Sequence, residues 1–172
     1  MKTADVALGG ILAALAVIVM LLGGVIPAAT YVCPMLASML LIPLLERMRR
    51  PACFGWFCVT AALSLILCPD RETAMVFAFL GWYPIAREHL SRLPAVPAIV
   101  CKLLVFNAAV AAMYGLLIFV FRLEALVEES KDLGLAMFAV LLIMGNVTFV
   151  LYDRLLLIFT VYYRRRAGTR RR

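Results

Sequence analysis

The sequence predicts an all-α, polytopic membrane protein, in which a bundle of six transmembrane helices has both termini in the cytoplasm. Of the 172 residues, 66% are hydrophobic and the mean hydropathy is +1.03, whereas soluble domains are about 45–50% apolar. The polar breaks between the apolar blocks also alternate between basic and acidic. Such alternation is typical of membrane proteins, because Lys and Arg beside helix ends are retained in the cytoplasm.

Six apolar blocks supply the predicted helices in order. They run over residues 6–25, 28–45, 51–68, 73–86, 98–121 and 133–163. A helix needs about 20 apolar residues to cross the hydrocarbon layer, and a backbone in lipid must satisfy its own hydrogen bonds. The short block 73–86 must therefore tilt, use flanking residues or stop short of a full crossing. The long last block is expected to tilt or to protrude into the cytoplasm.

Prolines and aromatic residues mark several block ends. Pro34, Pro43 and Pro84 lie inside or near the ends of their blocks. They either punctuate ordinary helices or free backbone carbonyls to line a cavity. The segment 81–84, Gly-Trp-Tyr-Pro, ends the fourth block. Because Trp and Tyr prefer the headgroup level, we interpret this segment as an interfacial anchor.

Basic residues assign the sides of the membrane. If the N-terminus is cytoplasmic, twelve basic residues fall inside and three fall outside. The inside set is Lys2, Arg47, Arg49, Arg50, Arg87, Arg92, Arg164, Arg165, Arg166, Arg170, Arg171 and Arg172, and the outside set is Arg71, Arg122 and Lys131. This bias predicts a multi-pass cell-membrane protein with a transmembrane domain over residues 1–163 and a basic cytoplasmic tail over 164–172.

The net charge of +7 does not indicate nucleic-acid binding, because the basic residues flank apolar blocks or gather in the tail. The tail can instead bind anionic lipid headgroups, which makes the bilayer the expected partner. The five cysteines lie within or at the ends of apolar segments without zinc-ligand spacing, so we expect buried thiols and no metal site.

Catalysis is not expected. The single histidine, His89, has neither companion metal ligands nor a neighbouring nucleophile. The sequence contains no phosphate-binding glycine loop, metalloprotease helix signature or serine elbow. The chain is therefore predicted to be neither an enzyme nor an ATPase, with no catalytic residues and no cofactor.

Small residues form two strips on the first predicted helix. Ala7, Gly10 and Ala14 share one face, and Gly9 and Ala13 belong to a neighbouring strip. In lipid, helices associate largely through close backbone approach at small residues. The strips either pack inside the chain's own bundle or form a docking face for another membrane protein.

These features resemble those of the substrate-binding S subunits of energy-coupling factor (ECF) transporters. The resemblance rests on the opening Lys2-Thr3-Ala4, the Gly/Ala-rich first helix, the size, the six predicted spans and the cytoplasmic termini. It implies a subunit that binds a vitamin or micronutrient from the outer side. It also implies that Gly10 and Ala14, or Gly9 and Ala13, dock on a membrane coupling subunit, while two ATPase subunits supply energy. The loop at residues 24–28 is shorter than the loop that often caps the ligand in this family.

Two charged residues at membrane depth are expected to meet. A charge near the bilayer centre costs about 2.5–3.5 kcal/mol on insertion scales, so it requires a partner or a role. Lys102 and Asp153 lie on the fifth and sixth predicted helices, which we expect to be antiparallel neighbours. In one interpretation, Lys102 and Arg154 snorkel to the inner interface and Asp153 pairs with one of them. In the other, the charge pair is coupled to conformational change or partner docking.

Other polar residues are candidates for ligand contact. Asn107 and Asn146 lie near the midplane of the same two helices, where an amide commonly bonds to a neighbouring helix. If a ligand enters from outside, Asn107, Asn146 and Tyr114 could meet it, with Thr30 and Tyr31 as weaker candidates. Such groups suit a flat molecule with polar edges.

A rival hypothesis is a non-transport membrane scaffold in a cell-envelope or cell-shape complex, similar to the rod-shape-determining membrane proteins. The two hypotheses differ in the interior. A transporter subunit should hold an outward-open cavity lined by Asn107, Tyr114 or Asn146. A scaffold should fill that volume with apolar side chains.

Overall fold

The computed structural model describes residues 3–24, 29–91, 94–119 and 135–169. These residues form α-helices and no strands, so the predicted all-α fold class is confirmed for the part of the chain described. The acidic segment 122–132 and the charged positions at both extreme ends, on which part of the side assignment rests, lie outside the described residues.

Within the described residues, four helices are long and apolar enough to cross a membrane. They are α1 (Thr3–Gly23), α4 (Arg50–Leu67), residues Pro97–Leu116 of α7 (Ala95–Phe119) and residues Leu142–Arg166 of α9 (Leu135–Thr169). Their outward faces carry exposed aliphatic side chains, which a lipid environment tolerates and water does not. With a rise of about 1.5 Å per residue, α9 is about 52 Å long and exceeds a hydrocarbon core of about 30 Å.

The other two predicted spans are each broken into two short helices. Residues 28–45 form α2 (Val32–Met39) and α3 (Leu41–Leu45), and residues 73–86 fall in α5 (Arg71–Leu80) and α6 (Tyr83–Leu90). Both breaks lie at prolines. Pro43 has no N–H to donate to the carbonyl of Met39, and Pro84 has none for Leu80, so neither helix continues through its break.

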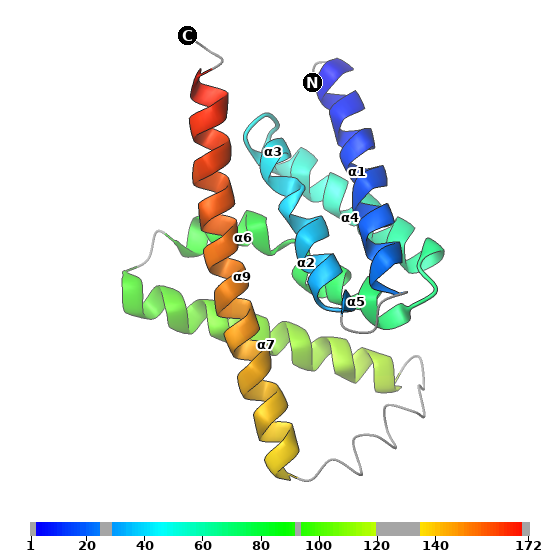
Figure 1. The fold of residues 1–172 in the computed structure, drawn as a ribbon, viewed down its shortest axis with the longest axis vertical. Coiled ribbons are helices and arrows are strands. Elements are labelled where there is room, and N and C mark those ends of the chain that lie inside the picture. The colour runs from blue at the N-terminus through cyan, green and yellow to red at the C-terminus, as the bar shows by residue number, and fades with distance from the viewer. Residues whose placement is uncertain (1–2, 25–28, 92–93, 120–134, 170–172) are drawn as a thin grey trace.

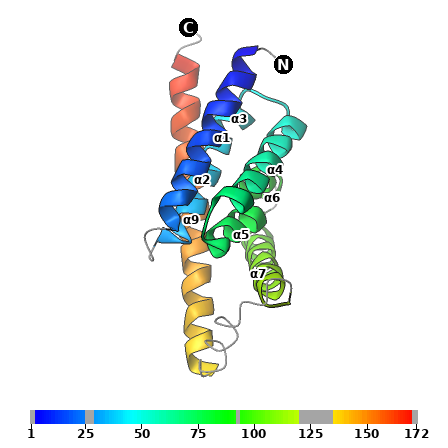
Figure 2. The same ribbon diagram turned by 90° about the vertical axis from the view of Figure 1, so that its right-hand side faces the viewer.

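The helices form a packed group with α7 laid across it. Figures 1 and 2 show α1, α2 and α4 against one another, with α5 at one end of the group. The first turn of α1 and the last turns of α9 lie at the same end of the molecule (Figure 1). In Figure 1, α7 runs crosswise to α9, and in Figure 2 it is strongly foreshortened. The expectation that these two helices are antiparallel neighbours is wrong, because they meet at a crossing.

Two apolar clusters form most of the core. One joins α1, α2, α4 and α5 around Ala16, Met20 and Phe77. The other joins α3, α5, α6, α7 and α9 around aromatic rings. The Phe106 and Phe149 rings stack with centroids 4.5 Å apart, a type of pair worth about 0.5–1.5 kcal/mol beyond its buried area. Tyr83 belongs to this second cluster and Tyr114 packs against it, so the core helps to position both residues.

Candidate functional site

A tyrosine–glutamate cluster, defined as Tyr31, Glu72 and Tyr114, lies where three helices approach one another. Glu72 is in the first turn of α5, Tyr31 immediately precedes α2, and Tyr114 is in the last turns of α7. The end of α1 lies beside it, because an added Cβ at Gly24 would be 3.1 Å from the Cβ of Asp70. The cluster therefore lies at the end of α1 opposite its first turn.

The start of α5 sets the orientation of Glu72. Asp70 caps the helix, accepting hydrogen bonds from the backbone N–H groups of Glu72 at 3.0 Å and Thr73 at 3.3 Å. The Thr73 hydroxyl also donates to Asp70 at 2.5 Å. A side-chain cap of this kind is worth about 1 kcal/mol and fixes the first turn. The Glu72 side chain thus projects from a defined position toward the two tyrosines.

Hydrogen bonds connect all three members of the cluster. Tyr31 Oη donates to Glu72 Oε1 at 2.5 Å, and Tyr114 Oη donates to the same oxygen at 3.0 Å. The two tyrosine oxygens are 2.7 Å apart. Burial, together with the bond to Glu72, raises the pKa of the Tyr31 hydroxyl above its usual range, so it remains a donor. Tyr31 is nevertheless 43% exposed, which leaves the cluster open on one side.

Among the residues that the structure describes, the charge of Glu72 has no counter-ion. Within the described residues its carboxylate forms no ion pair, and its Oε2 atom accepts no hydrogen bond. The adjacent Arg71 is directed elsewhere, because its Nη1 donates to the carbonyl of Leu65 at 2.8 Å. The positive end of the α5 dipole favours an anion at this position. Glu72 is therefore a half-buried carboxylate met by phenols and a helix end alone.

The Asp153 cluster, defined as Tyr83, Arg87, Lys102 and Asp153, joins α6, α7 and α9. Asp153 Oδ1 accepts from Tyr83 Oη at 2.8 Å and from Arg87 Nε at 2.7 Å, and Oδ2 accepts from Lys102 Nζ at 2.8 Å. The three charged side chains are only 12–17% exposed. The structure thus brings Lys102 and Asp153 together and adds a second cation and a phenol.

The segment 81–84 is a helix junction. Tyr83 is 1% exposed and bonds to Asp153, so its interpretation as an interfacial anchor is wrong. Trp82 is half-buried and its Nε1 donates to the carbonyl of Phe79 at 2.7 Å. The preference of Trp and Tyr for the headgroup level predicted a lipid contact here, whereas the Tyr83 hydroxyl donates to the largely buried carboxylate of Asp153.

Asn107 and Asn146 form a reciprocal pair between α7 and α9. Each Nδ2 donates to the other residue's Oδ1, at 2.8 and 3.2 Å. Each Nδ2 also donates to the carbonyl four residues earlier in its own helix, at 2.8 Å. Both N–H groups of each amide are therefore in use. This arrangement matches the interpretation that the pair links two helices. Tyr114, by contrast, contacts Tyr31 and Glu72.

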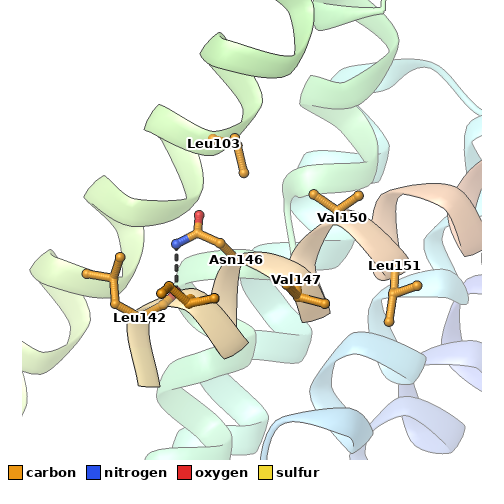
Figure 3. A pocket seen from close by; sticks show the side chains of 7 residues that line it. Leu103, Leu142, Asn146, Val147, Val150 and Leu151 are labelled. Carbon is orange, nitrogen blue, oxygen red and sulfur yellow. Dashed lines mark hydrogen bonds between the residues drawn. The ribbon is translucent and has the colours of Figure 1, made fainter. Parts of the chain in front are cut away.

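A groove of about 360 Å³ lies along the α7–α9 crossing (Figure 3). It is lined by Leu103, Leu142, Ile143, Asn146, Val147, Val150 and Leu151. In Figure 3 the Asn146 amide is directed at its own helix, toward Leu142. Of the three residues expected to line a ligand cavity, only Asn146 borders this groove, and the groove offers a polar ligand little else to bind.

The two small-residue strips of α1 have different environments. Gly9 is buried, its carbonyl accepts from Trp56 Nε1 at 2.8 Å, and Ala13 is half-buried. Ala7, Gly10 and Ala14 are exposed, and a Cβ at Gly10 would meet nothing within 4 Å. The strip of Gly9 and Ala13 therefore packs inside the bundle, whereas the other strip is uncovered in the described chain.

Sequence reasoning missed three residues of these clusters: Tyr83, which was interpreted as an interfacial anchor, Glu72 and Arg87. Glu72 was treated only as part of an acidic outer break, and Arg87 only as part of a cytoplasmic loop. Thr30 is half-buried next to Tyr31. Cys33, Cys53 and Cys68 are buried as expected, but Cys58 is exposed, which corrects the expectation for that thiol. The described residues contain no group of three or more His, Cys, Asp or Glu side chains that could hold a metal ion.

Comparisons of the chain with models of protein families, with curated proteins and with solved structures find no significant match.

Proposed function

We propose that this chain is the substrate-binding membrane subunit of an uptake transporter of the ECF type. In this proposal a small molecule binds at the tyrosine–glutamate cluster, and the exposed strip of α1 docks on a coupling subunit. The observation that carries the proposal is the Glu72 carboxylate, half-buried between two tyrosine hydroxyls and without a counter-ion in the described chain. Convergent polar groups of this kind are what orients a small ligand in a site.

The position of the cluster supports uptake from outside. It lies at the end of α1 opposite its first turn, and the basic-residue bias assigns the first turn to the cytoplasm. The ion pairs Arg164–Glu46 and Arg50–Glu88 lie in segments that the same bias assigns to the cytoplasm. The cell membrane, with both termini inside, is accordingly the proposed location.

The exposed strip of α1 supports docking. Ala7, Gly10 and Ala14 present no large side chain, and a neighbouring helix could approach closely there. The sequence contains no phosphate-binding glycine loop, so the energy for uptake would come from separate ATPase subunits.

Co-purification tests the proposal. The tagged chain, isolated from its native membrane in mild detergent, is expected to bring down ATPase subunits with a membrane coupling subunit. Gly10→Leu and Ala14→Leu should abolish that recovery. Gly55→Leu is the matched control, because Gly55 is also an exposed helical glycine with nothing within 4 Å of an added Cβ.

Two outcomes would count against the proposal. If both α1 variants retain the complex, the docking face on α1 is refuted. If the chain repeatedly returns with cell-envelope or cell-shape proteins and without any ATPase, the scaffold hypothesis replaces transport.

A further inference from the structure

Glu72 differs from the other described carboxylates that have a hydrogen-bond or ion-pair partner. Glu46 pairs with Arg164, Glu88 pairs with Arg50, and Asp153 holds two cations. Asp70 is occupied by the backbone of α5. Glu72 alone in this set has neither a cation nor a backbone donor on its carboxylate.

The two oxygens of Glu72 are unequal. Oε1 receives both tyrosine hydroxyls, whereas no described group donates to Oε2. A carboxylate offers about four lone-pair directions, so Oε2 has full capacity for a new donor. Glu72 itself is half-buried, so part of its side chain reaches the surface beside the exposed Tyr31.

We infer that the ligand of this site carries a primary ammonium group, which binds Glu72 Oε2 beside the Tyr31 hydroxyl; this inference rests on the proposed function. An anionic ligand would be repelled by the carboxylate. An N⁺–H···O⁻ hydrogen bond is about twice as strong as a neutral one, so a cationic donor gains most from this site. The compact ammonium also has three N–H donors, which suits a carboxylate with a neighbouring phenol oxygen.

An inorganic cation fits less well. Ca²⁺ takes six to eight oxygen ligands, and the cluster supplies one carboxylate and two phenols. The described residues contain no group of three or more His, Cys, Asp or Glu side chains that could form such a shell. An organic ammonium needs only the few acceptors that are present, and the remainder of the molecule can contact the open side.

Thermal unfolding of the purified full chain in detergent tests the inference. The probes are ethylamine, butylamine, benzylamine and 2-phenylethylamine, each paired with the alcohol of the same carbon skeleton, at pH 7 and constant ionic strength. At least one amine is expected to raise the Tm in a saturable manner while its alcohol does not. Glu72→Gln should weaken the binding of that amine by about tenfold or more, because the charge-assisted hydrogen bond is lost.

Glu88→Gln is the control, since it removes an equally negative carboxylate that is paired elsewhere and should leave the amine response unchanged. Glu72→Asp, which keeps the charge, guards against a folding defect in Glu72→Gln and should retain part of the response. The inference is overturned if no amine differs from its alcohol in the native chain, or if Glu72→Gln responds as the native chain does.

The test is independent of the complex. If the chain binds amines selectively but no ATPase subunits co-purify with it, the ammonium site is supported and the transporter proposal is refuted. If the complex is recovered but the chain does not distinguish amines from alcohols, the transporter proposal is supported and the ammonium inference is refuted.

Discussion

The tyrosine–glutamate cluster and the Asp153 cluster use the same chemical groups in opposite ways. Each centres on one carboxylate that accepts tyrosine hydroxyls and links three helices. In the Asp153 cluster both carboxylate oxygens are occupied and two cations surround one anion. In the tyrosine–glutamate cluster, Glu72 Oε2 accepts no hydrogen bond from a described residue, and no described Lys or Arg pairs with the carboxylate.

This difference separates a structural role from the proposed binding role. A buried carboxylate whose oxygens all have donors has no capacity left for a ligand. Its removal leaves the charges of its partners buried without a counter-ion. A half-exposed carboxylate with an unused oxygen is less important for stability and remains available. The two clusters are thus expected to respond in opposite ways to substitution, with stability affected at one and ligand binding at the other.

The largest effect is expected at Asp153. Asp153→Asn leaves the charges of Arg87 and Lys102 buried without an anion, which typically costs about 3–5 kcal/mol. Unfolding of the purified chain, by heat or by denaturing detergent, measures the loss. Arg164→Gln is the control, because its pair with Glu46 is largely exposed and should contribute less than about 1 kcal/mol. Equal stability of Asp153→Asn and the native chain would show that the Asp153 cluster does not hold α6, α7 and α9 together.

A smaller effect is expected at Gly23, and it should act on the other cluster. A Cβ at Gly23 would lie 2.9 Å from the Cβ of Cys33 and 3.2 Å from Thr73, so α1, α2 and α5 must move apart. Gly23→Ala should cost about 1–3 kcal/mol, as overpacking usually does. It should also weaken amine binding, because α2 and α5 carry Tyr31 and Glu72 at their starts.

Gly10→Ala is the matched substitution for Gly23→Ala. No atom lies within 4 Å of its added Cβ, so its effect on stability should be neutral or favourable by up to about 1 kcal/mol. If the two alanine variants are equally stable and bind amines equally, the close approach of α1 to the tyrosine–glutamate cluster is not maintained in the folded chain.

The apolar runs made much of the helical arrangement predictable. The blocks 6–25, 51–68 and 98–121 correspond closely to α1, α4 and α7. Hydropathy does not register a break inside a run, however, so the interruptions before Pro43 and at Pro84 divided two predicted spans. The crossing of α7 over α9 depends on packing between distant segments and leaves no local signal in the sequence.

The two clusters differed in predictability for a physical reason. Lys102 and Asp153 are charges inside apolar runs, and such charges require partners, so their contact could be proposed from the sequence. Arg87 lies in a polar stretch and Glu72 lies at a helix start, where solvent and the helix dipole already account for them. When a charged residue is already explained by its local surroundings, the sequence gives no indication that it also contacts a distant segment.

The smallest loss of stability among the cluster residues is expected at Tyr31, and this substitution tests the comparison most finely. Tyr31→Phe removes one hydroxyl from a half-exposed site and should cost no more than about 1 kcal/mol, since solvent can replace the lost hydrogen bond. The same change leaves Glu72 Oε1 with Tyr114 as its remaining described donor and should weaken amine binding severalfold, measured by the same Tm titration.

Tyr83→Phe is the counterpart in the Asp153 cluster, where a buried carboxylate loses a donor. Stability should fall by about 1–3 kcal/mol while amine binding is unchanged. If Tyr31→Phe proves the more destabilising of the two, the assignment of binding to one cluster and stability to the other must be reversed.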